Sequence, residues 1–330
     1  MARGDNQFDR LLENVGRLKA EIAKVIVGQD AVIEELLIAL FCRGHALIVG
    51  VPGLAKTLIV STFGQALDLE FRRVQFTPDL MPSDITGTEV LEEDQKTKER
   101  SFRFVKGPVF TNLLLADEIN RTPPKTQSAL LQAMQEHTVT YNGVTYPLPE
   151  PFFVLATQNP IEQEGTYPLA EAQLDRFFFE INISYPSAEE ELSIVRRTTA
   201  ADLPCAAKVM SAQDVLEIQN LVRQVPSADH VEDAAVAIAR RTRPQDPSSP
   251  AIVKEFLAWG AGPRATQSLV LAAKARAILS GRNAPSTEDL LRVASPVLRH
   301  RLILNFRARA QNKSEEEVIA EVVNKGPLRN

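Results

Sequence analysis

The sequence has little cysteine, few histidines and no long apolar run, and each shortage excludes a class of protein. Cys42 and Cys205 are its two cysteines, and their wide separation argues against a disulfide framework or a zinc site. The four histidines are scattered, which is unlike a metal centre. Apolar stretches stay shorter than the roughly eighteen residues that a membrane helix needs, and residues 1–5 do not resemble a signal peptide. Reduced thiols and a cytoplasmic location without membrane insertion are therefore expected.

Positive charge is also scarce. The 330 residues carry a net charge of −5, and residues 1–186 combine 17 basic with 25 acidic side chains, a net −8. This balance argues against nucleic acid as a partner. Residues 264–309 are the exception, with nine Lys/Arg and two acids. This basic segment is either a solvated face or a contact for phosphates or for an acidic neighbouring subunit.

The most informative stretch is a glycine-bearing loop at residues 50–57, GVPGLAKT. An apolar run at 46–49 precedes it and a helix-compatible segment to Leu67 follows, which is the context of a phosphate-binding loop. Lys56 is expected on the β- and γ-phosphates, and the Thr57 hydroxyl on Mg²⁺. Ala55 stands where glycine is common. The predicted nucleotide contacts here are Gly50, Val51, Pro52, Gly53, Leu54, Ala55, Lys56, Thr57 and Leu58.

The hydrophobic pattern predicts an α/β fold followed by helices. Apolar and β-branched runs predict five strands of a parallel sheet, at 46–49, 71–76, 112–118, 152–157 and 177–183. Two helices are expected within 5–42, and hairpins near 85–105 and 138–146. Beyond residue 186 the pattern is helical, with helices near 187–201, 211–225, 229–243, 264–280 and 286–306. Pro296 is expected to kink or break the last of them. Two domains follow: an αβα core at 1–186, and a helical lid with a C-terminal tail at 187–330.

Two acids end the third predicted strand. Asp117 can lie beside the phosphate loop and hold Mg²⁺ through water, while Glu118 can accept a proton from the water that attacks the γ-phosphate. Asn159 ends the fourth strand. Because ligands of parallel sheets bind at the carboxyl ends of strands, Asn159 can contact the same phosphate.

Two arginines are further candidates. Arg176 lies between a predicted helix and strand, and Arg264 begins a helix of the second domain. Each can stabilise the charge of a transition state, as arginine fingers do. Each can equally form a surface or capping ion pair, and the sequence leaves this choice open.

Four ordered segments resemble the MoxR-type AAA+ ATPases: GVPGLAKT at 50–57, LADEINR at 115–121, ATQNP at 156–160 and EAQLDRF at 171–177. Ala55 also fits this family. The resemblance implies an AAA+ P-loop core with a helical lid. It identifies residues 50–57 as Walker A and Asp117-Glu118 as Walker B.

The same resemblance implies further roles. Asn159 becomes sensor 1, Arg264 sensor 2, acting in cis or in trans, and Arg176 the arginine finger that reaches a neighbour's ATP. Val27 and Gly28 resemble the segment that packs on adenine. The two hairpins resemble the helix-2 insertion and the pre-sensor-1 insertion, which face a central pore or the substrate. Gln75 is a weaker candidate for gating Glu118.

The implied activity is ATP hydrolysis with ATP and Mg²⁺ as ligands. The implied assembly is a ring, a hexamer, whose chaperone-like work matures partner complexes. Partners with a von Willebrand factor A (VWA) domain and metal insertion are implied by the family alone. A nucleic-acid-dependent motor or loader and an ATP-binding assembly switch with little turnover are the alternatives.

Overall fold

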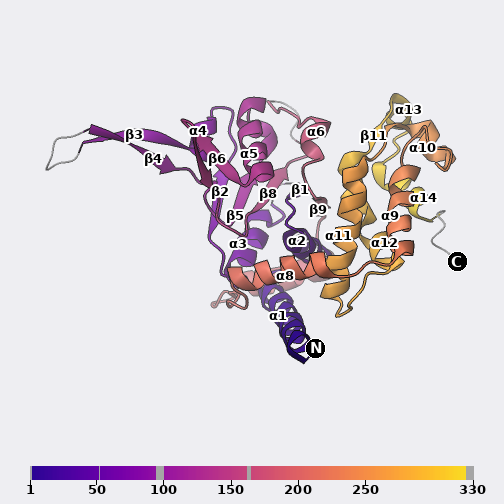
Figure 1. The fold of residues 1–330 in the computed structure, drawn as a ribbon, viewed down its shortest axis with the longest axis horizontal. Coiled ribbons are helices and arrows are strands. Elements are labelled where there is room, and N and C mark those ends of the chain that lie inside the picture. The colour runs from indigo at the N-terminus through magenta and orange to yellow at the C-terminus, as the bar shows by residue number, and fades with distance from the viewer. Residues whose placement is uncertain (1, 52, 94–99, 162–164, 325–330) are drawn as a thin grey trace.

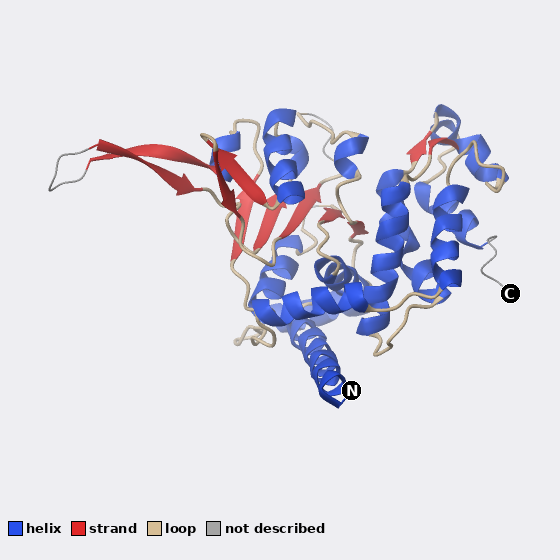
Figure 2. Ribbon diagram, in the orientation of Figure 1, coloured by secondary structure: helices blue, strands red, loops and turns tan. Residues whose placement is uncertain are grey.

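A computed structural model describes residues 2–51, 53–93, 100–161 and 165–324, and Figures 1 and 2 show their arrangement. Two helices begin the chain, as predicted: α1 (Ala2–Val25) and α2 (Asp30–Phe41). Gly28, at a φ of +71°, lies in the short break between them. Its left-handed backbone suits glycine, and a Cβ there would lie 2.3 Å from the Glu190 carboxyl group.

The five predicted strands form one parallel sheet in the order β2-β5-β8-β1-β9, which confirms the predicted fold class. Its members are β1 (Ala46–Val49), β2 (Phe71–Gln75), β5 (Leu113–Asp117), β8 (Phe153–Gln158) and β9 (Phe179–Asn182). Because all five strands run the same way, their carboxyl ends share one edge of the sheet and their amino ends share the other.

Helices cover both faces of the sheet because its central strands are apolar on both sides. In β5, Leu113 and Leu115 pack with α2 and with α3 (Lys56–Ala66), whereas Leu114 and Ala116 pack with α5 (Pro124–Glu136). Alternate strand residues point to opposite faces, so this pattern produces three layers. Short helical turns complete this half of the chain: α4 (Pro82–Thr86), η1 (Ile119–Arg121) and α6 (Glu171–Leu174).

Both predicted hairpins are present. The first joins β3 (Gly87–Glu93) to β4 (Arg100–Lys106) and extends far from the sheet in Figure 1. Residues 94–99, between the two strands, lie outside the described residues. The second joins β6 (Thr138–Tyr141) to β7 (Val144–Pro147). Phe104 of the first stacks on Tyr146 of the second, with ring centroids 4.5 Å apart, so the two hairpins support each other.

The C-terminal half is helical, as predicted. Its helices are α7 (Ala188–Thr198), α8 (Ala212–Gln224), α9 (Asp229–Arg241), α10 (Ala251–Phe256), α11 (Pro263–Leu279), α12 (Thr287–Leu298), α13 (Phe306–Ala310) and α14 (Glu315–Asn324). Ser187, Ser211 and Ser286 each accept a hydrogen bond from the backbone N–H three residues later, which confirms the predicted helix starts.

The helix predicted over 286–306, with a kink or break at Pro296, is shorter than predicted, and its break comes two residues after that proline. Helix α12 contains Pro296 and ends at Leu298, and the turn η2 (Arg299–Arg301) follows it. The chain then extends into β11 (Ile303–Leu304), which pairs with β10 (Leu257–Trp259) in a small antiparallel sheet. The backbone hydrogen bonds of this pairing replace the helical ones. The sequence pattern did not reveal the pairing, because the partner strand is more than 40 residues away.

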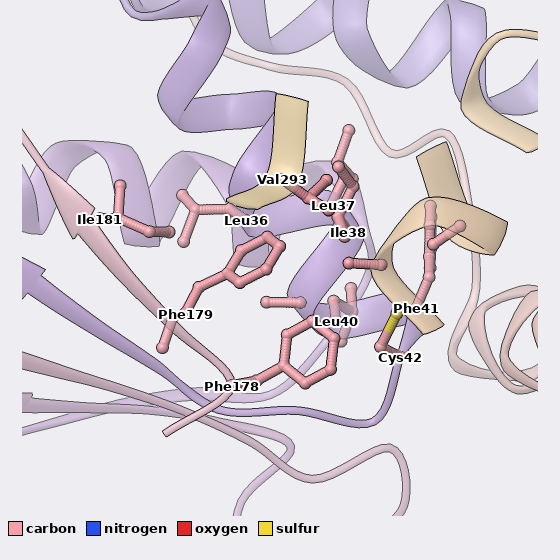
Figure 3. Packing of buried hydrophobic residues seen from close by; sticks show 14 of the residues in the cluster. Leu36, Leu37, Ile38, Leu40, Phe41, Cys42, Phe178, Phe179, Ile181 and Val293 are labelled. Carbon is pink, nitrogen blue, oxygen red and sulfur yellow. The ribbon is translucent and has the colours of Figure 1, made fainter. Parts of the chain in front are cut away.

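The core and the C-terminal helices are packed together tightly. In Figure 3, Leu36 and Leu37 of α2 lie in one apolar cluster with Phe179 of β9 and Val293 of α12. All four side chains are buried. One continuous apolar cluster therefore joins both sides of residue 186, and the domain division at that residue stays a prediction. No helix of the described residues is long and apolar enough to cross a membrane.

Acidic groups gather at the same junction. Burial raises the pKa of Glu35 on α2 and of Glu180 on β9 to about 7, although nearby Arg299 opposes the shift. Glu316 of α14 pairs with Arg299 at 2.8 Å and raises both pKa values further. Burial and the neighbouring Glu316 together outweigh the opposing effect of Arg299 on both carboxyl groups.

Replacing Glu180 with glutamine should stabilise the fold at alkaline pH. Because the pKa of Glu180 is higher in the folded protein, the folded state loses stability as the pH rises from the ordinary pKa of 4.5 through about 7. Above pH 7 the gain should be about 1–2 kcal/mol, because each pKa unit corresponds to about 1.4 kcal/mol and partial solvation reduces it. Denaturant unfolding at pH 5 and pH 8 measures this difference. Glu13→Gln, on the exposed side of α1, is the control; equal pH dependence of Glu180→Gln and wild type contradicts the prediction.

Candidate functional site

The phosphate loop connects the carboxyl end of β1 to the start of α3. Gly53 has a φ of +84° and Ala55 a φ of +53°, so two loop residues adopt the left-handed conformation. This conformation is easy for glycine and costs alanine about 1 kcal/mol, which explains why glycine is common at the position of Ala55. Pro52, also predicted in this loop, lies outside the described residues.

The loop's functional side chains lie where α3 begins. Lys56 Nζ donates a hydrogen bond to the Gly50 carbonyl at 2.6 Å, and Thr57 is the next residue of the helix. The Gly50 N–H donates to the Gln158 carbonyl at 3.3 Å, so the loop contacts the end of β8. Asn159 follows directly, is buried, and accepts a hydrogen bond from the Ile161 N–H. The structure thus brings the predicted sensor 1 beside the phosphate loop.

Asp117, the predicted metal ligand, ends β5 on the same edge. Its Oδ1 accepts a hydrogen bond from Thr157 Oγ1 at 2.6 Å, and its Oδ2 accepts from Arg73 at 2.7 Å. Thr157 is fully buried and also accepts the Glu118 N–H at 2.8 Å. One threonine therefore orients both acids. Sequence patterns did not identify Thr157, because a threonine inside a strand has an ordinary role in β-structure.

Glu118 has a φ of +58° and turns away from the strand direction. Its Oε2 accepts hydrogen bonds from Gln75 Nε2 at 2.8 Å and from Arg121 Nη1 at 3.0 Å. Gln75, the weaker candidate for gating Glu118, therefore contacts it directly. The carboxylate of the predicted catalytic base is held by a neighbouring strand and by the turn η1, rather than pointing freely into solvent.

An apolar pocket of about 140 Å³ adjoins the phosphate loop. Val27 lines it from the segment between α1 and α2, as the adenine prediction requires, whereas Gly28 faces Glu190 instead. The pocket is apolar because its lining also includes Leu54, Leu58, Pro186 and Ile194. Helix α7 therefore closes this pocket, which the sequence motifs did not reveal.

The predicted arginines lie on the opposite edge of the sheet. The Phe178 N–H donates to the His45 carbonyl just before β1, so Asp175 and Arg176 precede the amino end of β9. Arg264 Nη1 pairs with Asp175 at 3.3 Å. Buried Arg301 also donates to Asp175, at 2.8 Å, and so anchors it.

The amino-edge pocket that contains these groups is about 280 Å³ in volume. Arg176 and Arg264 both line it, and both are exposed. Neither lines the pocket beside the phosphate loop. Burial lowers the pKa of His45, another lining residue, to about 4. Its ring therefore stays neutral and accepts the Val154 N–H, which fits a structural role.

The described residues of the carboxyl edge fit a magnesium–nucleotide. The pocket offers an apolar surface of the kind on which an adenine ring packs, and the loop's left-handed residues orient backbone N–H groups as phosphate sites do. Hydroxyl and carboxylate oxygens, from Thr57 and Asp117, are the ligands that Mg²⁺ prefers. Bound Mg²⁺ would neutralise the charge that develops on the phosphate oxygens.

Comparison with known proteins agrees with this geometry. Residues 45–179 match the "ATPase family associated with various cellular activities (AAA)", and residues 249–322 match the "AAA lid domain". The chain is 45% identical to the chaperone MoxR1 of Mycobacterium tuberculosis over 92% of this chain and 79% of that protein. It is 31% identical to the protein MoxR of Methylorubrum extorquens over 91% of each.

A solved structure has the same fold. The crystal structure of a proposed ATPase from Cytophaga hutchinsonii matches with a TM-score of 0.92 and 41% identity. The match covers 100% of this chain and 99% of the other. The core, the hairpins and the C-terminal helices therefore share one arrangement in both proteins.

Substitutions at Ala55 should separate backbone conformation from side-chain chemistry. Ala55→Gly should keep nucleotide affinity, and its stability should stay within about 1 kcal/mol, because glycine adopts the observed φ freely. Ala55→Val should weaken binding roughly tenfold or more, because β-branched residues strongly disfavour the left-handed region. Titration with a fluorescent ATP analogue measures both. Ala200→Val, at an exposed position without positive φ, is the control, and equal affinity of the two valine variants would refute this explanation.

Proposed function

The chain belongs to the MoxR-type AAA+ ATPases, and from this membership we propose that it hydrolyses ATP with Mg²⁺ to drive the remodelling of partner proteins. One observation carries the proposal. The phosphate loop, Asp117, Glu118 and Asn159 meet at the carboxyl edge of one parallel sheet, beside an apolar pocket.

The proposed chemistry assigns each side chain a task. Lys56 binds the β- and γ-phosphates, and Thr57 with Asp117 holds Mg²⁺. Glu118 accepts a proton from the attacking water, and Asn159 helps to orient that water. Gln75 and Arg121 both donate to Glu118 Oε2, so movement of Gln75 would open one hydrogen-bond position on this oxygen for the attacking water.

The position of the two arginines supports a site shared between subunits. Strand β1 has four residues, so its two ends are roughly 13 Å apart at about 3.3 Å per residue. Arg176 lies at the amino end and the phosphate loop at the carboxyl end. We therefore propose that Arg176 and Arg264 both act in trans, on ATP bound to a neighbour in a ring, a hexamer.

The partner protein that the ATPase remodels, its client, is also proposed. The similarity to a protein named chaperone MoxR1 supports chaperone-like work on partner proteins. We propose partners with a VWA domain, matured in some cases by metal insertion, and a cytoplasmic site of action. The two mutually supported hairpins are the proposed contact elements, since β3–β4 projects away from the core (Figure 1).

Glu118→Gln should retain ATP and stop hydrolysis. The amide keeps the shape of the side chain but accepts no proton, so kcat should fall by roughly 10²–10⁴ while the Kd for ATP changes little. Filter binding of labelled ATP and release of phosphate measure the two quantities. Immobilised Glu118→Gln loaded with ATP should also retain the client. Equal, slow phosphate release by variant and wild type would favour the assembly-switch alternative.

Mixed rings should distinguish trans from cis action. Lys56→Ala and Arg176→Ala should each be inactive alone, whereas an equal mixture should regain activity at about a quarter of its subunit interfaces. There an intact Arg176 from one subunit meets an intact phosphate loop from the next.

The matched control is a mixture of Lys56→Ala with Glu118→Gln. Both substitutions damage the same half of the site, so no interface in these rings is complete. Recovery in neither mixture, with rings confirmed by light scattering, would contradict trans action. Recovery in the first mixture alone would support it.

A further inference from the structure

Arg73 lies at the metal-binding end of the site and is not part of any of the four motifs. It is on β2, the outermost strand on one side of the sheet as described, and its side chain is 47% exposed. Two of its guanidinium nitrogens donate to Asp117 Oδ2, Nε at 3.1 Å and Nη2 at 2.7 Å. Arg73 thus forms a close ion pair with the carboxylate proposed to hold Mg²⁺.

The other oxygen of that carboxylate is also engaged. Asp117 Oδ1 accepts the buried Thr157 hydroxyl at 2.6 Å. Both oxygens therefore have protein donors, and one of the donors is a cation. A guanidinium at hydrogen-bond distance neutralises the carboxylate and repels a second cation, so it competes with a divalent metal for Oδ2.

Arg73 also connects the metal ligand to the proposed base. Its Nη2 donates to Gln75 Oε1 at 2.7 Å, and Gln75 Nε2 donates to Glu118 Oε2 at 2.8 Å. Arg73 and Gln75 are two residues apart on one strand, so their side chains share a face. Movement of Arg73 would therefore remove a partner from both Asp117 and Gln75.

We propose that Arg73 is a positioning residue that stands in for the metal on Asp117 and must leave this carboxylate when a divalent cation binds with nucleotide. This proposal rests on the proposed function, because it takes Asp117 as the metal ligand. The exposed side chain on an edge strand has solvent into which it can move. Metal binding would thus break the hydrogen bond from Arg73 to Gln75. Gln75 could then turn away and give up its hydrogen bond to Glu118.

A competing explanation gives Arg73 the opposite effect. If the ion pair merely holds Asp117 in the orientation that the metal needs, removing the guanidinium should weaken metal binding. If Arg73 competes with the metal, removing it should strengthen binding. The sign of the change therefore decides between the two.

The experiment measures Mn²⁺ binding to the full chain loaded with ADP, by electron paramagnetic resonance of free Mn²⁺. Arg73→Met keeps the length of the side chain and removes its charge, so the Mn²⁺ Kd should fall roughly three- to tenfold. Arg73→Lys keeps a cation and should remain near wild type. ADP affinity measured in EDTA should be unchanged in both variants, because Arg73 has no proposed phosphate contact.

Arg72→Met is the matched control. Arg72 is adjacent on β2 and pairs with Glu70 at 2.7 Å, so this variant makes the same charge change away from Asp117. An equal fall in Kd for Arg72→Met and Arg73→Met would reduce the effect to net charge and overturn the proposal. An unchanged or higher Kd in Arg73→Met would also overturn it.

Asp117→Asn separates failure of this proposal from failure of the proposed function. Loss of Mn²⁺ binding in Asp117→Asn with an unchanged Kd in Arg73→Met refutes the role of Arg73 and leaves the metal site standing. Unchanged Mn²⁺ binding in Asp117→Asn refutes the metal assignment itself. Thermal melting of each variant confirms that the fold is intact.

Discussion

The parallel direction of five strands is the constraint on which the rest of this structure depends. It places the phosphate loop, Asp117, Glu118 and Asn159 on one edge of the sheet. The same constraint places Arg176 and Asp175, which pairs with Arg264, on the other edge. A short β-sheet thus separates two sets of groups that the proposed phosphoryl transfer uses together, and this separation is the reason for proposing a site shared between subunits.

The hydrophobic core limits how the sheet and the C-terminal helices of one chain can move relative to each other. Helix α2 packs against β9 and α12, and one apolar cluster runs from α1 to α14. Large separation of the core from the C-terminal helices would expose buried Leu36, Leu37 and Phe179, which is unfavourable in water. Small shear movements are therefore the motions that this packing favours.

Local sequence patterns predicted the parts of the site that are contiguous in the chain. The phosphate loop, the acids at the end of β5 and the capped helix starts each depend on neighbours within a few residues. Contacts between distant residues were not predictable in this way. The bonds of Thr157 and Arg73 to Asp117 bridge 40 and 44 residues, and no local rule pairs them.

The same distinction explains the errors. Residues 286–306 have helical periodicity, yet the pairing of β11 with β10 ends the helix early, and that partner is more than 40 residues away. The pocket beside the phosphate loop includes α7, which the motifs did not identify. Where tertiary contacts compete with local propensity, the sequence pattern alone cannot decide.

Activity as a function of protein concentration tests the shared site most directly. ATP hydrolysis per subunit should be measured by phosphate release while light scattering reports the mass of the assembly. We expect almost no hydrolysis by isolated subunits and a rise that follows ring formation, because the proposed role of Arg176 requires it to reach a neighbour's nucleotide. Full hydrolysis per subunit at concentrations where only monomers are present would contradict a shared site.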